Sequence, residues 1–323
     1  MNVVLGFDTS CYTTSAAAVN EQGQVVGSYR MLLPVPNGQR GLRQSEAVFV
    51  HVRQLPQVMR ELSEAIENAG AKVCAVAASH TPREAEESYM PVFMVGSGHA
   101  DVLADVLKVP AYRFSHQQGH IAAGQIGTVE MRERFVALHI SGGTTDLLLS
   151  DHGRLSAMGG SLDLHAGQMI DRVGVAMGLP FPAGPALEKT AMRCDAKPQS
   201  ILPVSMAQGD LCCHISGAET GCERLLEQGI LPKETLALEV FDFLARTVAR
   251  LLIAGCAKAD AKQALVVGGV ASSVLLRQLV GERLKKAGSA IEVVFGQPEY
   301  SADNAAGIAL LGMQEHLQKV HEL

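Results

Sequence analysis

The sequence predicts an α/β protein of two lobes, each built around a mixed β-sheet. Three observations lead to this prediction. Apolar strand-like runs alternate with segments of helical periodicity through most of the chain. A pattern of strand, turn, strand, turn and strand occurs twice, starting at Val3 and at Phe135. The 323 residues, 47% of them hydrophobic, exceed what one compact domain usually holds.

The repeated pattern lies in two stretches whose elements follow the same order. The first reads VVLGFDTSCYTTSAAAVNEQGQVVGSYR from Val3, and the second reads FVALHISGGTTDLLLSDHGRLSAMGG from Phe135. In each, a turn rich in Gly, Ser and Thr follows the first strand, and a tight polar turn follows the second. The stretches begin about 130 residues apart, which indicates an ancient duplication.

The remaining segments alternate between helices and short buried strands. Apolar spacing predicts helices over Glu46–Ala69, Gly98–Leu107, Leu236–Ala257 and Asn304–Leu317, with another helix starting at Ser272. Short apolar runs predict strands over Cys74–Ala78, Ala264–Val267 and Ile291–Phe295. Pro56 should kink or split the first helix, because proline lacks the N–H that a helix interior needs.

The order of these elements also predicts the division into lobes. We expect residues 1–130 plus 303–323 to form the first lobe and residues 131–302 to form the second. The stretch from about 160 to 235 is rich in Gly, Pro and Met, and its pattern is mostly helical. It therefore reads as an insertion into the second lobe.

Composition limits the possible functions. Charged residues make up 19% of the chain, and the formal net charge is −6. Binding to nucleic acid would therefore need a local basic patch, such as Arg40 with Arg43 or Arg132 with Arg134, or a partner protein. No apolar run approaches the roughly 20 residues that span a bilayer, and we see no signal peptide. Seven cysteines without a CxxC motif indicate free thiols, so we expect a cytoplasmic protein.

Three glycine-containing turns follow strands, at Asp8–Thr14, Ser141–Asp146 and Gly268–Ser273. Such turns can direct backbone N–H groups at a phosphate, although each one alone also fits a purely structural turn. Their order is the pattern of the two-lobed actin-like ATPase and sugar-kinase fold, a duplicated RNase H-like α/β fold with a cleft between its lobes. We accordingly expect nucleotide contacts from Asp8, Gly268 and Gly269.

The stretch SHQQGH places His116 and His120 four residues apart. On a helix the two imidazoles would lie on one face and could bind one metal ion. Two partly exposed histidines near a helix start are the structural alternative. The protease motif HExxH needs Glu after the first histidine, and position 117 is Gln. Asp303 is a candidate third ligand, although it or Ser301 could simply cap the following helix.

Six motifs in collinear order resemble one known family. They are LGFDTSC, SHQQGH, HISGGTTDLLL, LHAGQMIDRVGVAMGLPFPAGPALEKTA, LVVGGVASSVLLR and SADNAAGIALLG. Together they are similar to the TsaD-type tRNA threonylcarbamoyltransferases, formerly described as O-sialoglycoprotein endopeptidases (the glycoprotease family). The resemblance covers nearly the whole chain, and six ordered matches are far more specific than any one of them.

The resemblance implies a function and a set of site residues. It implies an acyl-transferring enzyme that passes a threonylcarbamoyl group from its adenylate to N6 of an adenosine in tRNA. One iron or zinc ion would be held by His116, His120 and Asp303, and the bound nucleotide would be ATP or threonylcarbamoyl-AMP. By resemblance the substrate would be lined by His139, Ile140, Ser141, Gly142, Gly143, Asp171, Gly184 and Ser273. The partners implied are tRNA and a second copy or a related subunit of actin-like fold, without a membrane.

The chain also departs from the family pattern. Tyr12 and Thr13 stand where the family has carboxylates, Thr144 replaces a histidine, and Gln118 replaces a glutamate. Glu219 replaces a lysine, Ser273 replaces an asparagine, and HTPREAEESYM at residues 80–90 replaces a glycine-rich loop. These changes leave no obvious general base, since His139 and Asp146 only flank the second turn. The departures indicate a divergent paralogue.

Several alternatives therefore stay open. The chain could be a carbamoyl-transferring or nucleotide-binding paralogue whose acceptor is not tRNA, as the acidic net charge of −6 would favour. It could be a non-catalytic partner of a true transferase, although the histidine pair argues against this. An actin-like kinase is a further alternative, but the HxxGH helix is not part of the kinase pattern. A metalloprotease is the least favoured, because this sequence has no glutamate base after the first histidine. The sequence does not identify the metal, the general base, the oligomeric state or the role of residues 80–90.

Overall fold

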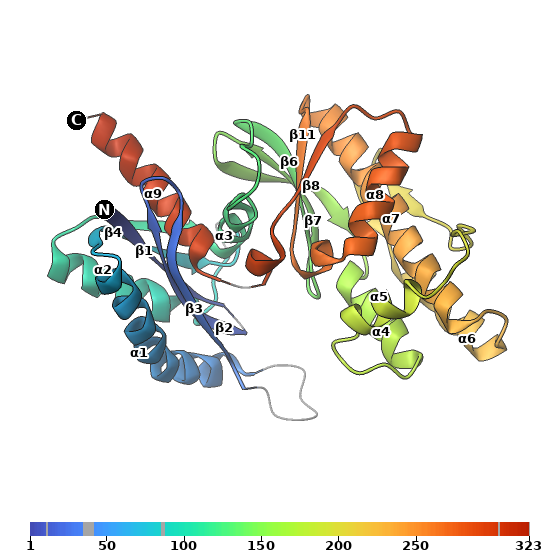
Figure 1. Cartoon of the computed structure of the whole chain (residues 1–323), viewed down its shortest axis with the longest axis horizontal. Coiled ribbons are helices and arrows are strands. Elements are labelled where there is room, and N and C mark those ends of the chain that lie inside the picture. The colour runs from blue at the N-terminus through green and yellow to red at the C-terminus, as the bar shows by residue number, and fades with distance from the viewer. Residues whose placement is uncertain (11, 35–41, 85–87, 303, 323) are drawn as a thin grey trace. The chain divides into compact units, whose positions relative to one another are not determined.

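A computed structural model of the chain describes residues 1–10, 12–34, 42–84, 88–302 and 304–322. It divides into two compact units (Figure 1). Unit 1 comprises Met1–Gly127 and Ala302–Leu323, and unit 2 comprises Thr128–Ser301. The borders expected from the sequence, at residues 131 and 302, differ from these by three residues and by one residue. Among the described residues, no helix is long and apolar enough to span a membrane.

Unit 1 is a five-stranded mixed sheet covered by helices. Its strands are β1 (Asn2–Thr9), β2 (Thr13–Asn20), β3 (Val25–Leu32), β4 (Lys72–Thr81) and β5 (Ala111–Ser115), in the spatial order β3-β2-β1-β4-β5. The first three strands pair antiparallel, and β4 and β5 join in parallel. Its helices are α1 (Gln44–Asn68), α2 (Phe93–Leu107), α3 (His116–Ala123) and α9 (Ala306–His321).

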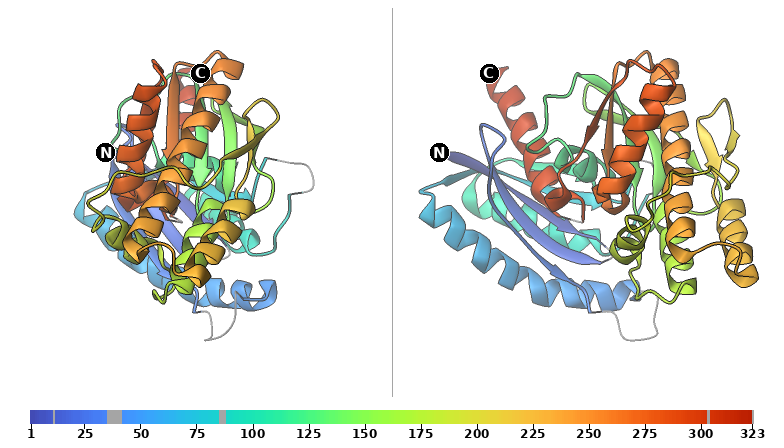
Figure 2. Two further views of the ribbon diagram at one scale, coloured as in Figure 1. Left: turned by 90° about the vertical axis from the view of Figure 1, so that its right-hand side faces the viewer. Right: turned by 45° about the vertical axis from the view of Figure 1, so that its right-hand side comes forward.

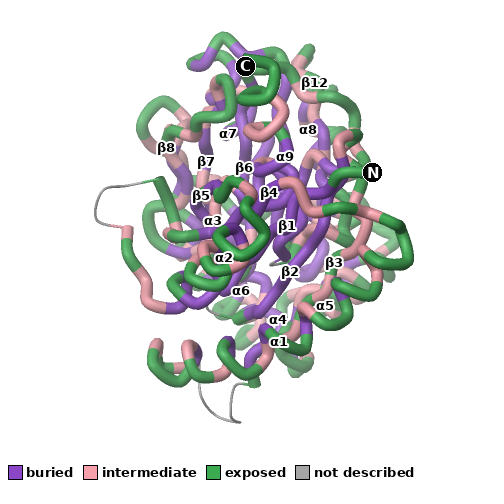
Figure 3. Tube along the Cα trace, turned by 90° about the vertical axis from the view of Figure 1, so that its left-hand side faces the viewer, coloured by how far each residue is buried: buried purple, intermediate pink, exposed green. Residues whose placement is uncertain are grey.

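The central strand β1 is buried on both faces, as its continuous apolar run requires (Figure 3). Because side chains alternate along a strand, Val3, Leu5 and Phe7 pack with α1 and α2 in one cluster. Val4 points the other way and packs with α9 in a second cluster. The sheet of unit 1 therefore lies between two helical layers, and α1 runs along one face of it (Figure 2).

Unit 2 repeats the strand order of unit 1. Its strands are β6 (Arg134–Ile140), β7 (Thr145–Asp151), β8 (Arg154–Ser161), β9 (Ser205–Ala207), β10 (Cys212–His214), β11 (Gln263–Val267) and β12 (Glu292–Phe295). Five of them, in the order β8-β7-β6-β11-β12, match β3-β2-β1-β4-β5 in both sequence order and direction. The repeated topology supports the duplication that the sequence indicates.

The helices of unit 2 are α4 (Ala166–Ala176), α5 (Gly184–Ala191), α6 (Ser216–Gln228), α7 (Lys233–Ala259) and α8 (Val274–Lys286). Helix α7 is the centre of the core, because it packs against β6 and β7 and also against α5 and α8. The stretch from about 160 to 235, where the sequence predicts a helical insertion, holds α4, α5, α6 and the short strands β9 and β10.

Three sequence-based expectations need correction. Helix α1 is not split at Pro56, and it continues from Gln44 to Asn68. Pro56 is exposed, and so is Val52, whose carbonyl loses its helical partner and can bind water instead. Helix α2 begins five residues before the expected Gly98, at Phe93. Helix α8 begins at Val274, after a short 3-10 turn over Gly269–Ser272.

The cysteines agree with the sequence prediction of free thiols. All six that lie in the described ranges are free: Cys74, Cys194, Cys212, Cys213, Cys222 and Cys256. Burial raises the pKa of Cys213 to about 12, which makes this thiol unreactive and a poor metal ligand.

Helices α3 and α9 approach each other so closely that only glycine fits between them. A Cβ atom added to Gly307 would lie 1.9 Å from the carbonyl oxygen of Gly119, and one added to Gly119 would lie 2.8 Å from Ile308 Cδ1. Glycine is therefore required at position 307, where α9 packs against the backbone of Gly119, and this contact brings the start of α9 beside the two histidines of α3.

We expect Gly307→Ala to destabilise unit 1 by about 1–3 kcal/mol or more, because the new methyl group would push α9 away from α3. The midpoint of urea unfolding would measure the loss. Gly98→Ala is the matched control, since Gly98 lies on the exposed face of α2 with nothing within 4 Å of an added Cβ. That change should raise stability slightly. Equal effects of the two substitutions would contradict the packing argument.

Asp163 ties the end of β8 to the start of α6. Burial works to raise the pKa of its carboxyl, but hydrogen bonds from the Ser216 hydroxyl and from the backbone N–H groups of Ile215, Leu164 and Ser216 outweigh this and lower the pKa to about 2. Ionised Asp163 therefore stabilises the fold of unit 2.

Because the folded-state pKa of Asp163 lies below its ordinary value of 3.8, its contribution is complete above that pH and is lost as the pH falls towards 2. We expect the urea midpoint of the unaltered protein to fall more steeply between about pH 4 and pH 2 than that of Asp163→Asn. An identical acid dependence of the two proteins would rule out this role of Asp163.

Candidate functional site

The two histidines of SHQQGH lie on helix α3, and Ser115, the residue before them, is the N-cap of this helix. The Ser115 hydroxyl accepts a hydrogen bond from the Gln118 backbone N–H at 3.2 Å, and Gln118 Oε1 accepts one from the Ser115 N–H at 2.7 Å. This reciprocal pair is a capping box, which fixes where the helix starts. His116 is thus the first residue of α3, and His120 lies one turn further on the same face.

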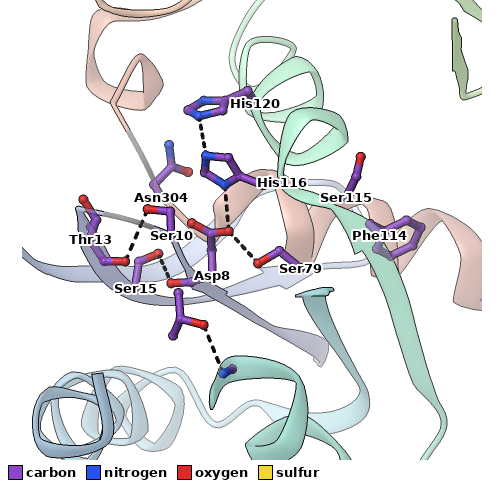
Figure 4. Close-up of polar contacts among 12 residues, drawn as sticks. Asp8, Ser10, Thr13, Ser15, Ser79, Phe114, Ser115, His116, His120 and Asn304 are labelled. Carbon is purple, nitrogen blue, oxygen red and sulfur yellow. Dashed lines mark hydrogen bonds and ion pairs between the residues drawn. The ribbon is translucent and has the colours of Figure 1, made fainter. Parts of the chain in front are cut away.

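The imidazoles of His116 and His120 point at each other (Figure 4). Their Nε2 atoms are 3.1 Å apart, and the two rings meet edge to face with an interplanar angle of 75°. Two nitrogens that bind one zinc ion tetrahedrally at 2.0–2.1 Å lie about 3.3 Å apart. The spacing of the two Nε2 atoms is thus close to the one that a shared metal ion would need, and metal binding by this pair stays a prediction.

Asp8, at the end of β1, lies on the other side of His116. Its Oδ1 accepts a hydrogen bond from His116 Nδ1 at 2.8 Å and another from the Ser79 hydroxyl at 2.6 Å. Asp8 is fully buried, and its Oδ2 has no hydrogen-bond partner within the described part of the chain. The nucleotide contact that the sequence predicts for Asp8 stays a prediction, and the contact with His116 has no signal in the sequence because the two residues are 108 positions apart.

The expected third ligand, Asp303, lies outside the described residues. Within the described ranges no group of three His, Cys, Asp or Glu side chains could hold a metal ion. The next residue, Asn304, accepts a hydrogen bond at the start of α9, from the Ala306 N–H to its Oδ1 at 3.0 Å. Ser301, which could have been a cap, instead donates its hydroxyl to the Pro298 carbonyl.

A buried histidine supports the turn between β1 and β2. His51 on α1 is fully buried, and its Nε2 donates to the Ser10 carbonyl at 2.8 Å. Its Nδ1 lies 2.7 Å from the Thr14 hydroxyl. Burial lowers the pKa of His51, so the ring is held neutral. The helical pattern of α1 marks position 51 as an inward position, but it does not reveal this contact with the turn.

In unit 2, the second glycine turn joins β6 to β7. The Ser141 N–H donates to the Thr144 carbonyl at 2.8 Å, which closes the turn. Gly142 and Gly143 are exposed and have open space around them, so a ligand can approach their backbone. His139 and Ile140 are buried in β6. The structure therefore offers Ser141, Gly142 and Gly143 at the surface, whereas His139 and Ile140 are enclosed by the core.

The N-terminus of α4 lies against this turn. The Gly167 N–H donates to the Ser141 carbonyl at 3.1 Å, and a Cβ on Gly167 would lie 2.7 Å from the backbone of Gly142. A helix N-terminus and exposed turn N–H groups both favour an anion.

The third glycine turn follows β11, the parallel neighbour of β6. Gly268 has a φ of +100°, and a Cβ there would lie 2.3 Å from the Ile140 carbonyl oxygen. Only glycine therefore lets this turn lie beside the end of β6.

Asp171 and Gly184, two further residues expected at the substrate, lie close together. Asp171 Oδ1 accepts the N–H of Ala183, the residue directly before Gly184, at 2.7 Å. Whether these groups bind a substrate stays a prediction.

Comparison with known proteins identifies the family. The family model described as "TsaD: tRNA N6-adenosine threonylcarbamoyltransferase" matches residues 39–310. The chain belongs to the TsaD family. A tRNA N6-adenosine threonylcarbamoyltransferase of Thermus thermophilus is 31% identical over 317 residues, which cover 97% of this chain and 93% of the relative. That of Symbiobacterium thermophilum is 30% identical, over 96% of this chain and 90% of the relative.

Membership in the TsaD family confirms the predicted family, the class of transferase and the role in tRNA modification. Solved structures confirm the actin-like fold. HypF of T. kodakarensis superposes with a TM-score of 0.63 at 14% identity over 98% of this chain and 48% of that chain. A ROK family glucokinase of Streptomyces griseus superposes with a TM-score of 0.54 at 15% identity over 97% of this chain and 99% of that chain.

Two departures from the TsaD pattern are compensated locally. Gln118 fills the capping-box position, which either Gln or Glu can occupy. Glu219 is buried, with its carboxylate 3.7 Å from the Arg172 guanidinium. The reversed charge at Glu219 is therefore paired within unit 2, and it does not present a bare negative charge to an RNA.

Ser273 has a structural role that the sequence did not reveal. Its hydroxyl caps α8 by accepting the Leu276 N–H at 3.1 Å and donates to Glu188 Oε1 at 2.8 Å. Glu188 also accepts the Leu275 N–H.

The departures at the first turn and at residues 80–90 differ in their exposure and contacts. Thr13 is buried, whereas Tyr12 is 54% exposed and can reach a ligand. In the 80–90 segment, the Pro82 carbonyl accepts the Gln117 N–H, so this segment begins beside α3.

We expect Gly167→Ala to weaken the binding of AMP to the protein by at least tenfold, because the added Cβ must displace the Ser141 turn from the N-terminus of α4. Isothermal titration calorimetry would measure the affinity. Gly217→Ala is the matched control, since Gly217 lies in helix α6 with nothing within 4 Å of an added Cβ. If Gly167→Ala leaves the affinity for AMP unchanged, the turn at Ser141 takes no part in nucleotide binding.

Proposed function

We propose that this chain transfers a threonylcarbamoyl group from threonylcarbamoyl-AMP to N6 of an adenosine in tRNA, and that one metal ion takes part. The observation that carries the metal-dependent part is the His116 and His120 pair, whose Nε2 atoms converge to 3.1 Å beside a buried carboxylate. Membership in the TsaD family supports the reaction itself.

The donor set fits iron or zinc, because imidazole nitrogens suit both ions. His116 and His120 would hold the ion, with Asp303 as the proposed third ligand. Two imidazoles and one carboxylate leave coordination positions open for oxygen atoms of the substrate. The ion would supply Lewis-acid stabilisation of negative charge on those oxygens.

Unit 2 would bind the donor. The exposed backbone of Gly142 and Gly143 and the N-terminus of α4 suit a phosphate group, such as that of ATP or threonylcarbamoyl-AMP. Gly268 and Gly269, together with Asp171, Gly184 and Ser273, are proposed to contact the nucleoside and threonyl parts. The proposed Asp8 contact with the nucleotide completes the expected set.

In the transfer step, the adenosine N6 attacks the carbamoyl carbon and a new C–N bond forms. The bond from that carbon to the phosphate oxygen breaks, and AMP leaves with the electron pair. The N6 proton passes to water or to the released phosphate. Fixed backbone N–H groups stabilise the negative charge that develops, without needing to reorganise during the reaction.

A net charge of −6 means that tRNA must be held by a local basic region or by a partner. Arg132 and Arg134 are exposed candidates in unit 2. We further propose pairing with a second copy or with a related subunit of actin-like fold, in the cytoplasm. The same net charge favours a second candidate function, in which a small molecule replaces tRNA as the acceptor.

The test is a transfer assay with metal-replete protein, threonylcarbamoyl-AMP and unmodified tRNA. We expect modified adenosine from the unaltered protein and a loss of at least about 100-fold in the variant with both His116→Ala and His120→Ala, because several kcal/mol of transition-state stabilisation depend on the ion. His99→Ala, a histidine on the exposed side of α2, is the matched control and should retain activity.

The two candidate functions give different results. If tRNA is the acceptor, the protein binds tRNA alone or with its partner, and the affinity falls as salt rises. Failure to modify tRNA, with threonylcarbamoyl-AMP still bound and no salt-dependent tRNA binding, would reject the tRNA acceptor and favour the small-molecule reaction.

A further inference from the structure

We infer that Asp8 is a positioning residue that fixes the tautomer and orientation of His116, so that His116 Nε2 faces His120. The inference rests on the metal-binding part of the proposed function. It concerns a contact between β1 and α3, which are separated by 108 residues in the sequence.

The first argument is the chemistry of the contact. An ionised carboxylate can only accept hydrogen bonds, so His116 Nδ1, 2.8 Å from Asp8 Oδ1, must carry the proton. In a neutral imidazole the other nitrogen then has a free lone pair. That nitrogen, His116 Nε2, is the one that lies 3.1 Å from His120 Nε2. Asp8 therefore selects the tautomer in which His116 can bind a metal ion through Nε2.

The second argument is the orientation of the ring. Asp8 is fully buried at the end of β1, and its Oδ1 is also fixed by the Ser79 hydroxyl of β4 at 2.6 Å. Because β1 and β4 are paired in the sheet, the carboxylate is held by a rigid element. Phe93 of α2 packs against the His116 ring with the centroids 5.6 Å apart. The ring is thus fixed from two sides, with one edge turned towards His120 (Figure 4).

The third argument is that the charge of Asp8 has no structural need. Both hydrogen bonds of the carboxylate end on Oδ1, and Oδ2 is buried with no hydrogen-bond partner in the described ranges. An asparagine of the same shape could keep Oδ1 as an acceptor. Burying a charge is costly, so the carboxylate adds something that an amide would not supply. A negative charge on the far side of a metal-bound imidazole raises the basicity of that ligand.

The first experiment uses the metal-free protein in alkaline solution, where neutral imidazole predominates. Long-range 1H–15N correlation spectra report which ring nitrogen of a histidine carries the proton. We expect His116 to be protonated at Nδ1 in the unaltered protein and at Nε2 in Asp8→Ala. Assignment of the His116 signals would come from His116→Gln. Protonation of His116 at Nε2 in the unaltered protein would overturn the inference.

The second experiment measures Co(II) binding by competition with a chromophoric chelator. We expect Asp8→Asn to remain folded and to bind Co(II) about 10–100-fold more weakly than the unaltered protein, the range seen when a partner of a metal ligand is lost. The visible absorption bands of bound Co(II) should also shift. Ser79→Ala is the control, since it removes the other hydrogen bond to Asp8 Oδ1 and leaves the His116 contact in place; it should lose less than about tenfold.

The outcomes separate the inference from the proposed function. Equal Co(II) affinity and spectra in Asp8→Asn and the unaltered protein would overturn the role of Asp8. Equal losses in Asp8→Asn and Ser79→Ala would also overturn it, because packing alone would then explain the effect. A protein that binds no Co(II) at all would remove the inference together with the metal-dependent function. Weak Co(II) binding in Asp8→Asn, with no tRNA modification by the unaltered protein, would support the inference and reject the function.

Discussion

The close contact between α3 and α9 is the constraint on which the candidate metal site depends. The backbone of Gly119 meets Gly307, where no side chain fits on Gly307. This contact fixes the axis of α3, and the capping box of Ser115 and Gln118 fixes where the helix starts. With the helix so defined, His116 and His120 share one face, and the sheet places Asp8 against the first of them. Packing thus determines the axis of α3, capping determines its first residue, and the order of the strands determines the position of Asp8.

Much of this could be predicted from the sequence, because it depends on local periodicity. The strands from Val3 and Phe135 alternate or run apolar as buried strands do, and the four-residue spacing of the histidines implies one helical face. The contacts of Asp8 with His116, of His51 with Ser10, and of Glu188 with Ser273 could not be predicted. They join residues far apart in the chain, and only the packing of strands and helices in three dimensions brings such residues together.

The departures from the TsaD pattern divide into two kinds. Gln118, Glu219 and Ser273 are each engaged by neighbours in the same unit, through a cap, an ion pair and a helix start. These substitutions maintain the local structure and do not by themselves argue against transfer chemistry. Tyr12 is different, because this residue is 54% exposed within the first turn, where it can contact a ligand directly. Altered substrate preference in this member of the family would therefore originate at that turn before any of the buried positions.

The chain path has a consequence for biosynthesis. Unit 1 is discontinuous, because it consists of Met1–Gly127 and Ala302–Leu323, whereas unit 2 is one continuous segment. The first part of unit 1 is therefore synthesised well before the last. During translation, unit 2 can fold as soon as its own residues leave the ribosome. The sheet of unit 1, although made first, lacks the helix α9 on one face until that helix emerges, and α3 until then lacks its main packing partner. A truncated polypeptide would thus expose one face of this sheet and carry an unformed histidine site, a state that chaperones and proteases recognise.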